Sequence, residues 1–201
     1  MSVMPLIANW RGRPNATTYS EALQVFELAN LTKKDVFYDL GCGYGWVCIW
    51  AARRCKSSKG IESHKHLVAK ARKNVQKSGL RNVEIIRGDF TKARLSDASV
   101  VYCVTDRDFN DFRRWDRRKR KKDLRIVTLG PPPIPVKPVR SQGSFYLTKF
   151  PFATARTADE WCHAVFRKGK GTFDDVRKEL ERRLSNDALA HYRRDFKKHF
   201  A

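Results

Sequence analysis

One stretch of the sequence decides the fold: Val36-Phe37-Tyr38-Asp39-Leu40-Gly41-Cys42-Gly43-Tyr44-Gly45. Its first half is mostly apolar and predicts a buried strand. The alternating glycines that follow predict a tight loop, because glycine adopts positive φ angles and lets a ligand approach the backbone closely. Residues 46–55 then resume with almost no polar face, which predicts a largely buried helix. A glycine loop between a strand and a helix is typical of a nucleotide-binding α/β domain.

The flanking sequence repeats this alternation. Strands are predicted at 59–62, 83–86, 99–104 and 124–129, and helices at 21–30 and 67–78, the latter ending at Gly79. Such a pattern predicts an open, parallel α/β sheet. Beyond it we expect a helix at 108–123 and a strand at 144–148. Residues 160–166 suit either a strand or a helix, and we favour a strand.

Three parts are expected along the chain. Residues 1–16 contain Pro5, Gly12 and Pro14 and predict an irregular N-terminal arm. Residues 17–166 would form the α/β domain. Residues 167–201 would add a basic helical hairpin, because apolar residues recur there at helical spacing and Thr172 suits a helix start.

The charge balance predicts polyanion contact. The 201 residues include 42 Lys and Arg against 21 Asp and Glu, a net charge of +21. Nucleic acid, a particle coated with it, or an anionic membrane surface would all attract such a protein. A single charge run is often only a solvated face, but several occur here. We expect nucleic-acid contact through one run of six bases: Arg117, Arg118, Lys119, Arg120, Lys121 and Lys122.

The cysteines and the hydropathy pattern indicate an intracellular protein. The five cysteines form no CxxC pair and no zinc-binding arrangement, so we expect reduced, buried thiols and no metal. No signal peptide is visible, and no apolar run approaches the roughly 18 residues that a membrane helix needs. We expect a cytoplasmic protein, or a nucleoid or nuclear one if it associates with chromatin, neither secreted nor membrane-bound.

Two acidic residues follow the next strands. Glu62 ends the second strand about twenty residues after the loop, where a carboxylate would accept hydrogen bonds from ribose hydroxyls. That feature alone also suits NAD. Asp89 follows the third strand, where it could accept from an adenine amine while Phe90 packs on the base; alternatively, it is a solvated strand-end residue beside a core ring. Together with Asp39 and its loop, these residues predict an adenosine-containing ligand at the strand ends.

Four stretches carry a family resemblance: Leu31-Thr32-Lys33-Lys34-Asp35-Val36-Phe37-Tyr38-Asp39-Leu40-Gly41-Cys42-Gly43, Gly60-Ile61-Glu62, Gly88-Asp89-Phe90 and Val100-Val101-Tyr102-Cys103-Val104. Residues 17–109 resemble the seven-stranded, class I methyltransferases that use S-adenosyl-L-methionine. They are similar in particular to the non-SET enzyme acting on a histone core lysine and to its small archaeal protein-lysine methyltransferase relatives. The resemblance implies a Rossmann-like sheet with helices on both faces.

The resemblance also implies roles for individual residues. Asp39, Gly41 and Gly43 in the loop would contact the methionine part of S-adenosylmethionine, and Cys42 beside them would also belong to the cofactor site. Glu62 would hold the ribose, and Asp89 and Phe90 the adenine. Thr17, Thr18 and Tyr19 would fold over the cofactor as a flap.

The methyl acceptor stays open between classes. If it is a protein lysine, Tyr19 could wall its channel and Asp106 could orient the amine or take its proton, although Asp106 could equally cap a helix. The histone enzyme has two asparagines where this chain has Thr105-Asp106, so the acceptor pocket differs. Protein lysine is the first hypothesis. An RNA acceptor (tRNA or rRNA) is the second, although the Asn/Asp-Pro-Pro-aromatic loop of many base methylases is lacking.

A third hypothesis is a non-catalytic nucleic-acid-binding module on the same fold. The intact Asp39, Glu62 and Asp89 argue against it. The sequence makes no prediction of oligomeric state.

Overall fold

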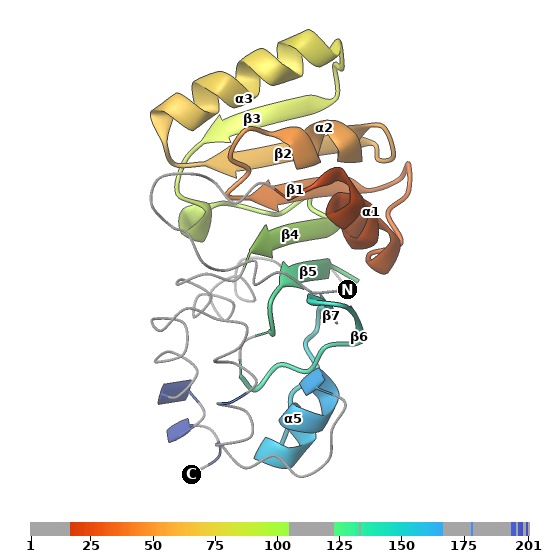
Figure 1. The fold of residues 1–201 in the computed structure, drawn as a ribbon, viewed down its shortest axis with the longest axis vertical. Helices are drawn as coiled ribbons and strands as arrows, with labels where there is room; N and C mark the ends of the chain where they lie inside the picture. The colour runs from red at the N-terminus through yellow and green to blue at the C-terminus, as the bar shows by residue number, and fades with distance from the viewer. Residues whose placement is uncertain are drawn as a thin grey trace.

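The described residues form a seven-stranded sheet in the order β3-β2-β1-β4-β5-β7-β6 (Figure 1). The computed structural model describes residues 17–104, 123–132 and 134–166, together with the single residues Lys178, Arg194, Asp195, Lys197, Lys198 and Phe200. The strands are β1 (Val36–Leu40), β2 (Ser57–Glu62), β3 (Val83–Arg87), β4 (Val100–Val104), β5 (Arg125–Leu129), β6 (Arg140–Gln142) and β7 (Phe145–Lys149).

The sheet is parallel from β3 to β5 and antiparallel at its far end. β7 runs antiparallel to β5, and β6 pairs with β7 as the edge strand. The strand order reverses direction between β1 and β4, because the chain builds β2 and β3 on one side and later strands on the other. Ligands of open α/β sheets bind outside the carboxyl ends of the strands at such a switch point.

Helices cover both faces of the sheet. α1 (Tyr19–Leu28), α2 (Trp46–Ala52) and α3 (Lys65–Ser78) lie on one face, and α5 (Ala158–Phe166) packs at the β7 end (Figure 1). α5 contacts Tyr146 of β7, which faces the opposite side of the sheet from Phe145 and Leu147. Alternate residues of β1 separate the two core layers. Phe37 packs with α1 and α2, whereas Tyr38 joins the opposite layer. The predicted Rossmann-like sheet with helices on both faces is therefore confirmed.

Most predicted elements are present, with two differences. Residues 160–166 are helical rather than extended, so the predicted strand is wrong. Trp161, Cys162 and Val165 are buried at helical spacing, and the Trp161 indole Nε1 donates to the carbonyl of Val136 at 3.1 Å. The short strand β6 was not predicted, because its three residues are polar and carry no apolar pattern. It is a strand only through its pairing with β7.

Several predictions fall on residues that are not described. The arm 1–16, most of the helix 108–123 with the basic run 117–122, and most of the extension 167–201 lie outside the described residues. The three-part division of the chain therefore stays a prediction. Phe200 is described and packs against the cluster around Trp161.

All five cysteines are buried. The described ranges contain no group of three His, Cys, Asp or Glu side chains suited to a metal. Every helix within those ranges is too short or too polar to cross a bilayer.

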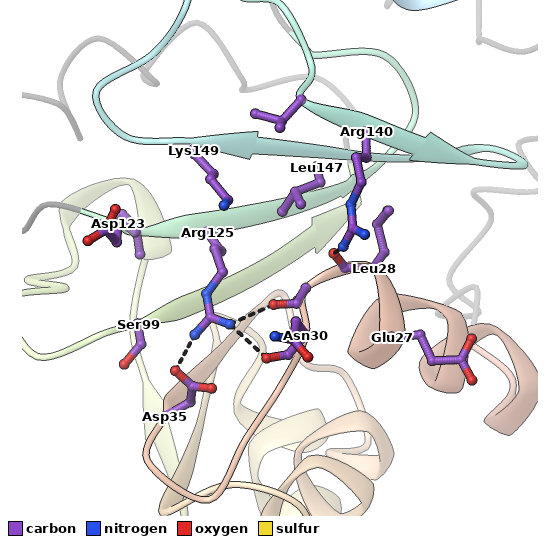
Figure 2. Close-up of a pocket in the computed structure, with 13 residues that line it drawn as sticks. Glu27, Leu28, Asn30, Asp35, Ser99, Asp123, Arg125, Arg140, Leu147 and Lys149 are labelled. Carbon is purple, nitrogen blue, oxygen red and sulfur yellow. Dashed lines mark hydrogen bonds and ion pairs between the residues drawn. The ribbon is translucent and has the colours of Figure 1, made fainter.

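A large cavity of about 840 Å³ lies at the amino-terminal start of β5 and the end of α1, remote from the glycine loop. Figure 2 shows that its guanidinium groups already have partners. Arg125 donates to the carbonyls of Ala29 at 2.6 Å and Asn30 at 2.8 Å and pairs with Asp35. Arg140 donates to the carbonyl of Leu28 at 2.6 Å. These contacts satisfy the C-terminal carbonyls of α1 and hold the helix on the sheet.

Candidate active site

The glycine loop turns sharply across the end of β2. The N–H groups of Gly41 and Cys42 both donate to the carbonyl of Ile61, at 2.8 and 3.1 Å. Gly43 has a φ of +53°, which a side chain would strain. Gly60 is needed for a close approach, since a Cβ there would lie 2.6 Å from the Cys42 sulfur. β2 and the loop are thus packed directly against each other.

A cavity opens beside this loop at the carboxyl ends of β1 and β4. Its described lining combines the loop with residues from α2, β4 and the segment before α1: Thr17, Asp39, Gly41, Cys42, Gly43, Tyr44, Trp46, Val47, Tyr102 and Val104. This is the switch point of the sheet, where the sequence predicted a ligand. The structure therefore brings the predicted residues Asp39, Gly41, Cys42 and Gly43 together on one wall.

Asp39 is the buried acid of this cavity. Its side chain is only 4% exposed, and the Cys48 thiol lies 3.8 Å from its Oδ2 atom as a weak donor. Burial raises the pKa of Asp39 to about 7, with a further rise from the nearby negative charge of Glu62. A neighbouring cation would stabilise the ionised form of this carboxyl and lower its raised pKa.

Glu62 is held against the loop in its ionised form. Its Oε2 accepts from the N–H of Gly43 at 3.1 Å, and its Oε1 accepts from the N–H of His64 at 2.9 Å. Burial by itself would raise the pKa of Glu62, but these bonds and the His64 side chain keep it below its ordinary value. An ionised carboxylate at the end of β2 is suited to accept hydrogen bonds from a ribose diol.

Asp89 lies close to the end of β2 that carries Glu62. The N–H of the preceding residue, Gly88, donates to the carbonyl of Glu62 at 3.0 Å. Asp89 Oδ1 accepts from the N–H and hydroxyl of Thr91, which lower the pKa of Asp89. The Phe90 ring packs against the core layer that contains Tyr38. Neither residue is among the described lining of the loop cavity, and their adenine contacts stay a prediction.

The predicted flap divides into two parts. Thr17 lines the cavity, and its hydroxyl lies 3.0 Å from the hydroxyl of Tyr102. Thr18 instead forms a capping box with Glu21 at the start of α1. The ring of Tyr19 lies edge-on against Trp50, outside the described cavity lining. Thr17 is therefore the flap residue that the structure places at the loop, and the proposed roles of Thr18 and Tyr19 stay predictions.

Sequence reasoning missed the cavity walls Trp46 and Tyr102. Tyr102 pairs in register with Asp39 on the neighbouring strand, so both side chains share one face of the sheet. Trp46 is the first residue of α2 and therefore adjoins the loop. The pairing register of β1 and β4 could have identified Tyr102. Asp106, the predicted acceptor-side residue, lies outside the described residues, as does the basic run.

The residues at this site fit S-adenosylmethionine. The ligand is cationic at its amino group and its sulfonium, and the cavity places the buried carboxyl of Asp39 among loop backbone atoms. The ionised Glu62 at the adjoining strand end suits the ribose. When bound, S-adenosylmethionine supplies an activated methyl group; the protein residues supply position and charge.

Comparisons with known proteins identify the family to which the chain belongs. A sequence family described as a methyltransferase domain matches residues 37–125. A protein-lysine N-methyltransferase of Saccharolobus islandicus (strain REY15A) is 33% identical over 109 residues, covering 52% of this chain and 68% of that protein. An uncharacterized RNA methyltransferase of Protochlamydia amoebophila (strain UWE25) is 45% identical over 71 residues, but this chain spans only 15% of its length.

The solved structures include an RNA methyltransferase from Salinibacter ruber in complex with S-adenosyl-L-homocysteine. It aligns with a TM-score of 0.63 and 28% identity, covering 72% of this chain and 99% of that chain. All three are methyltransferases; their names differ in the acceptor, and the Salinibacter structure was solved with S-adenosyl-L-homocysteine. The chain belongs to the class I methyltransferases and is an enzyme that uses S-adenosylmethionine.

Proposed function

We propose that this enzyme transfers methyl groups to the side-chain amine of a protein lysine. The observation that carries the proposal is the match to the Saccharolobus protein-lysine methyltransferase, which covers 68% of that protein. The matched RNA methyltransferase of Protochlamydia is covered over only 15% of its length. The membership in an enzyme family also favours catalysis over the non-catalytic binding module considered above.

The cavity walls suit the chemistry that a lysine acceptor requires. A lysine with a free pKa of about 10.4 must be neutral to act as nucleophile, which costs about 4.6 kcal/mol at pH 7. Trp46, Tyr102 and Val104 form an aromatic and apolar side of the cavity. Apolar walls disfavour the ammonium form, which lowers this cost. Asp106 would then accept the proton or orient the amine.

RNA is the second candidate acceptor. This chain covers 99% of the length of the Salinibacter RNA methyltransferase at 28% identity, and this match favours RNA as the acceptor. The net charge of +21 and the basic run 117–122 suit an RNA substrate or an RNA-bound protein substrate. Under either acceptor we propose nucleic-acid contact through that run.

The test is transfer of labelled methyl groups from S-adenosylmethionine to a cell extract, divided among RNase, DNase and protease treatments. We expect label that survives both nucleases, is lost with protease, and lies on lysine by mass spectrometry. Label removed by RNase would replace the lysine proposal with the RNA one. The Glu62→Ala variant is the matched control, because it should label neither acceptor.

A further inference from the structure

Three aromatic side chains form a strip on the outer surface of α1 and α2. We define the aromatic strip as Tyr19, Trp46 and Trp50. Trp46 and Trp50 lie one helical turn apart and are stacked, with ring centroids 6.3 Å apart and planes 21° apart. Tyr19 meets Trp50 edge-on at 5.2 Å. Tyr19 is 51% exposed and Trp46 43%, so large ring surfaces face solvent. Exposed aromatic patches commonly mark interaction sites.

Positive charge adjoins the strip. A depression of about 550 Å³ is lined, among the described residues, by Tyr19, Trp50, Arg53 and Arg54. Both arginines are exposed, and the Lys33 amine donates to the Arg53 carbonyl at 2.7 Å, which brings a third cation to the same place. No acidic residue belongs to this described lining. The surface therefore repels a lysine-rich peptide and attracts a polyanion.

The strip adjoins the active site, because Trp46 is a member of the strip and also lines the loop cavity. A chain that lies along the strip would therefore reach the wall of the cofactor cavity at Trp46. The surface is built from α1, α2 and the two arginines that follow α2, and it is defined without the residues 117–122.

We propose that the aromatic strip, with Arg53 and Arg54, docks single-stranded RNA. Bases stack on the exposed rings, and the arginines contact phosphates. The occupant is single-stranded because unpaired bases are free to stack on aromatic side chains, whereas those of a duplex are already stacked. It is RNA rather than DNA because two of the matched relatives are RNA methyltransferases. This inference does not depend on the methyl acceptor: RNA held here is either the substrate or the carrier of a protein substrate.

The test measures binding of a fluorescent, unstructured 12-nucleotide RNA to the full chain by anisotropy, without cofactor and over a range of salt concentrations. Trp46→Leu should weaken binding by about 5-fold to 150-fold, the effect of losing about 1–3 kcal/mol of stacking per base. Its salt dependence should stay unchanged, because no charge is removed. The double variant Arg53→Gln/Arg54→Gln should lower the salt slope by about 1.4, or about 0.7 for each phosphate contact.

Val139→Ser is the matched control, since Val139 is an exposed apolar residue beside the other end of α1. It should bind RNA like the unmodified chain. The proposal is overturned if Trp46→Leu and the control bind equally well, or if duplex RNA or single-stranded DNA binds more tightly than the single-stranded RNA. It is also overturned if the strip variants lose affinity for a lysine-rich peptide instead of RNA.

Should thermal unfolding show that Trp46→Leu is poorly folded, the double arginine variant decides by itself. Failure here would leave labelling of lysine unaffected, so the two proposals are tested separately.

Discussion

The buried carboxyl of Asp39 should make cofactor binding depend on pH. Its side chain is 4% exposed, and its pKa is raised to about 7 by burial. We expect Asp39 to face the cationic methionine part of S-adenosylmethionine, which favours the ionised form. Below pH 7 the free enzyme must therefore lose a proton when the cofactor binds. Affinity should rise with pH until Asp39 is already ionised in the free enzyme.

The size of the effect follows from the ionised fraction. With a pKa of about 7, about 1% of the free enzyme carries ionised Asp39 at pH 5 and about 50% at pH 7. If the complex keeps Asp39 ionised throughout, affinity should increase about 50-fold over this range, or about 2.3 kcal/mol. Glu62 should contribute little, because its lowered pKa keeps it ionised over the same range.

Isothermal titration calorimetry at pH 5, 6 and 7 checks this, in two buffers with different ionisation enthalpies. At pH 6 close to one proton should be released for each cofactor bound. The range stops at pH 7 because the cofactor's own α-amino group titrates near about 8. Asp39→Asn is the matched control, isosteric and unable to titrate, and should bind with a much flatter pH profile. Identical profiles for the two proteins would refute the reasoning.

Three further predictions concern stability. Because the folded pKa of Asp39 is raised above its ordinary value of 3.8 to about 7, the folded state alone holds the proton between these values. The contribution of Asp39 to the free energy of unfolding should therefore fall by about 4 kcal/mol as pH rises through this window; it is measured by urea denaturation as the difference between the unmodified chain and Asp39→Asn. Arg125→Met would leave Asp35 buried without its cation and release the end of α1, at a cost of about 3 kcal/mol; adding Asp35→Asn should recover part of the loss in thermal unfolding, and no recovery would contradict the pairing argument. Gly60→Ala would place a methyl group 2.6 Å from the Cys42 sulfur and should cost about 1–3 kcal/mol while weakening cofactor binding; unchanged stability would show that the loop can yield.

Much of the parallel sheet could be predicted because its elements carry local patterns. The apolar run Val36–Leu40 is the observed β1. Gly79, with a φ of +69°, ends α3 as its type and position predict. The loop residues and Glu62 could be placed at one site because parallel strands bring their carboxyl ends to the same edge. α5 could not be distinguished from a strand, because its short apolar stretch suits both; the tertiary hydrogen bond from Trp161 to the carbonyl of Val136 is a contact that the local sequence does not show.

The sequence by itself determined the class of fold, the cofactor and the acidic residues Asp39 and Glu62 at the carboxyl ends of β1 and β2, because strand periodicity and loop glycines act within a few residues of chain. Only the tertiary structure decided the raised pKa of Asp39, the pairing of Tyr102 with Asp39, and the clamp of Arg125 on α1. Each of these depends on burial or on contact between distant segments. The aromatic strip belongs to the same class: Tyr19 and Trp50 are separated in sequence and form one surface only because α1 packs on α2.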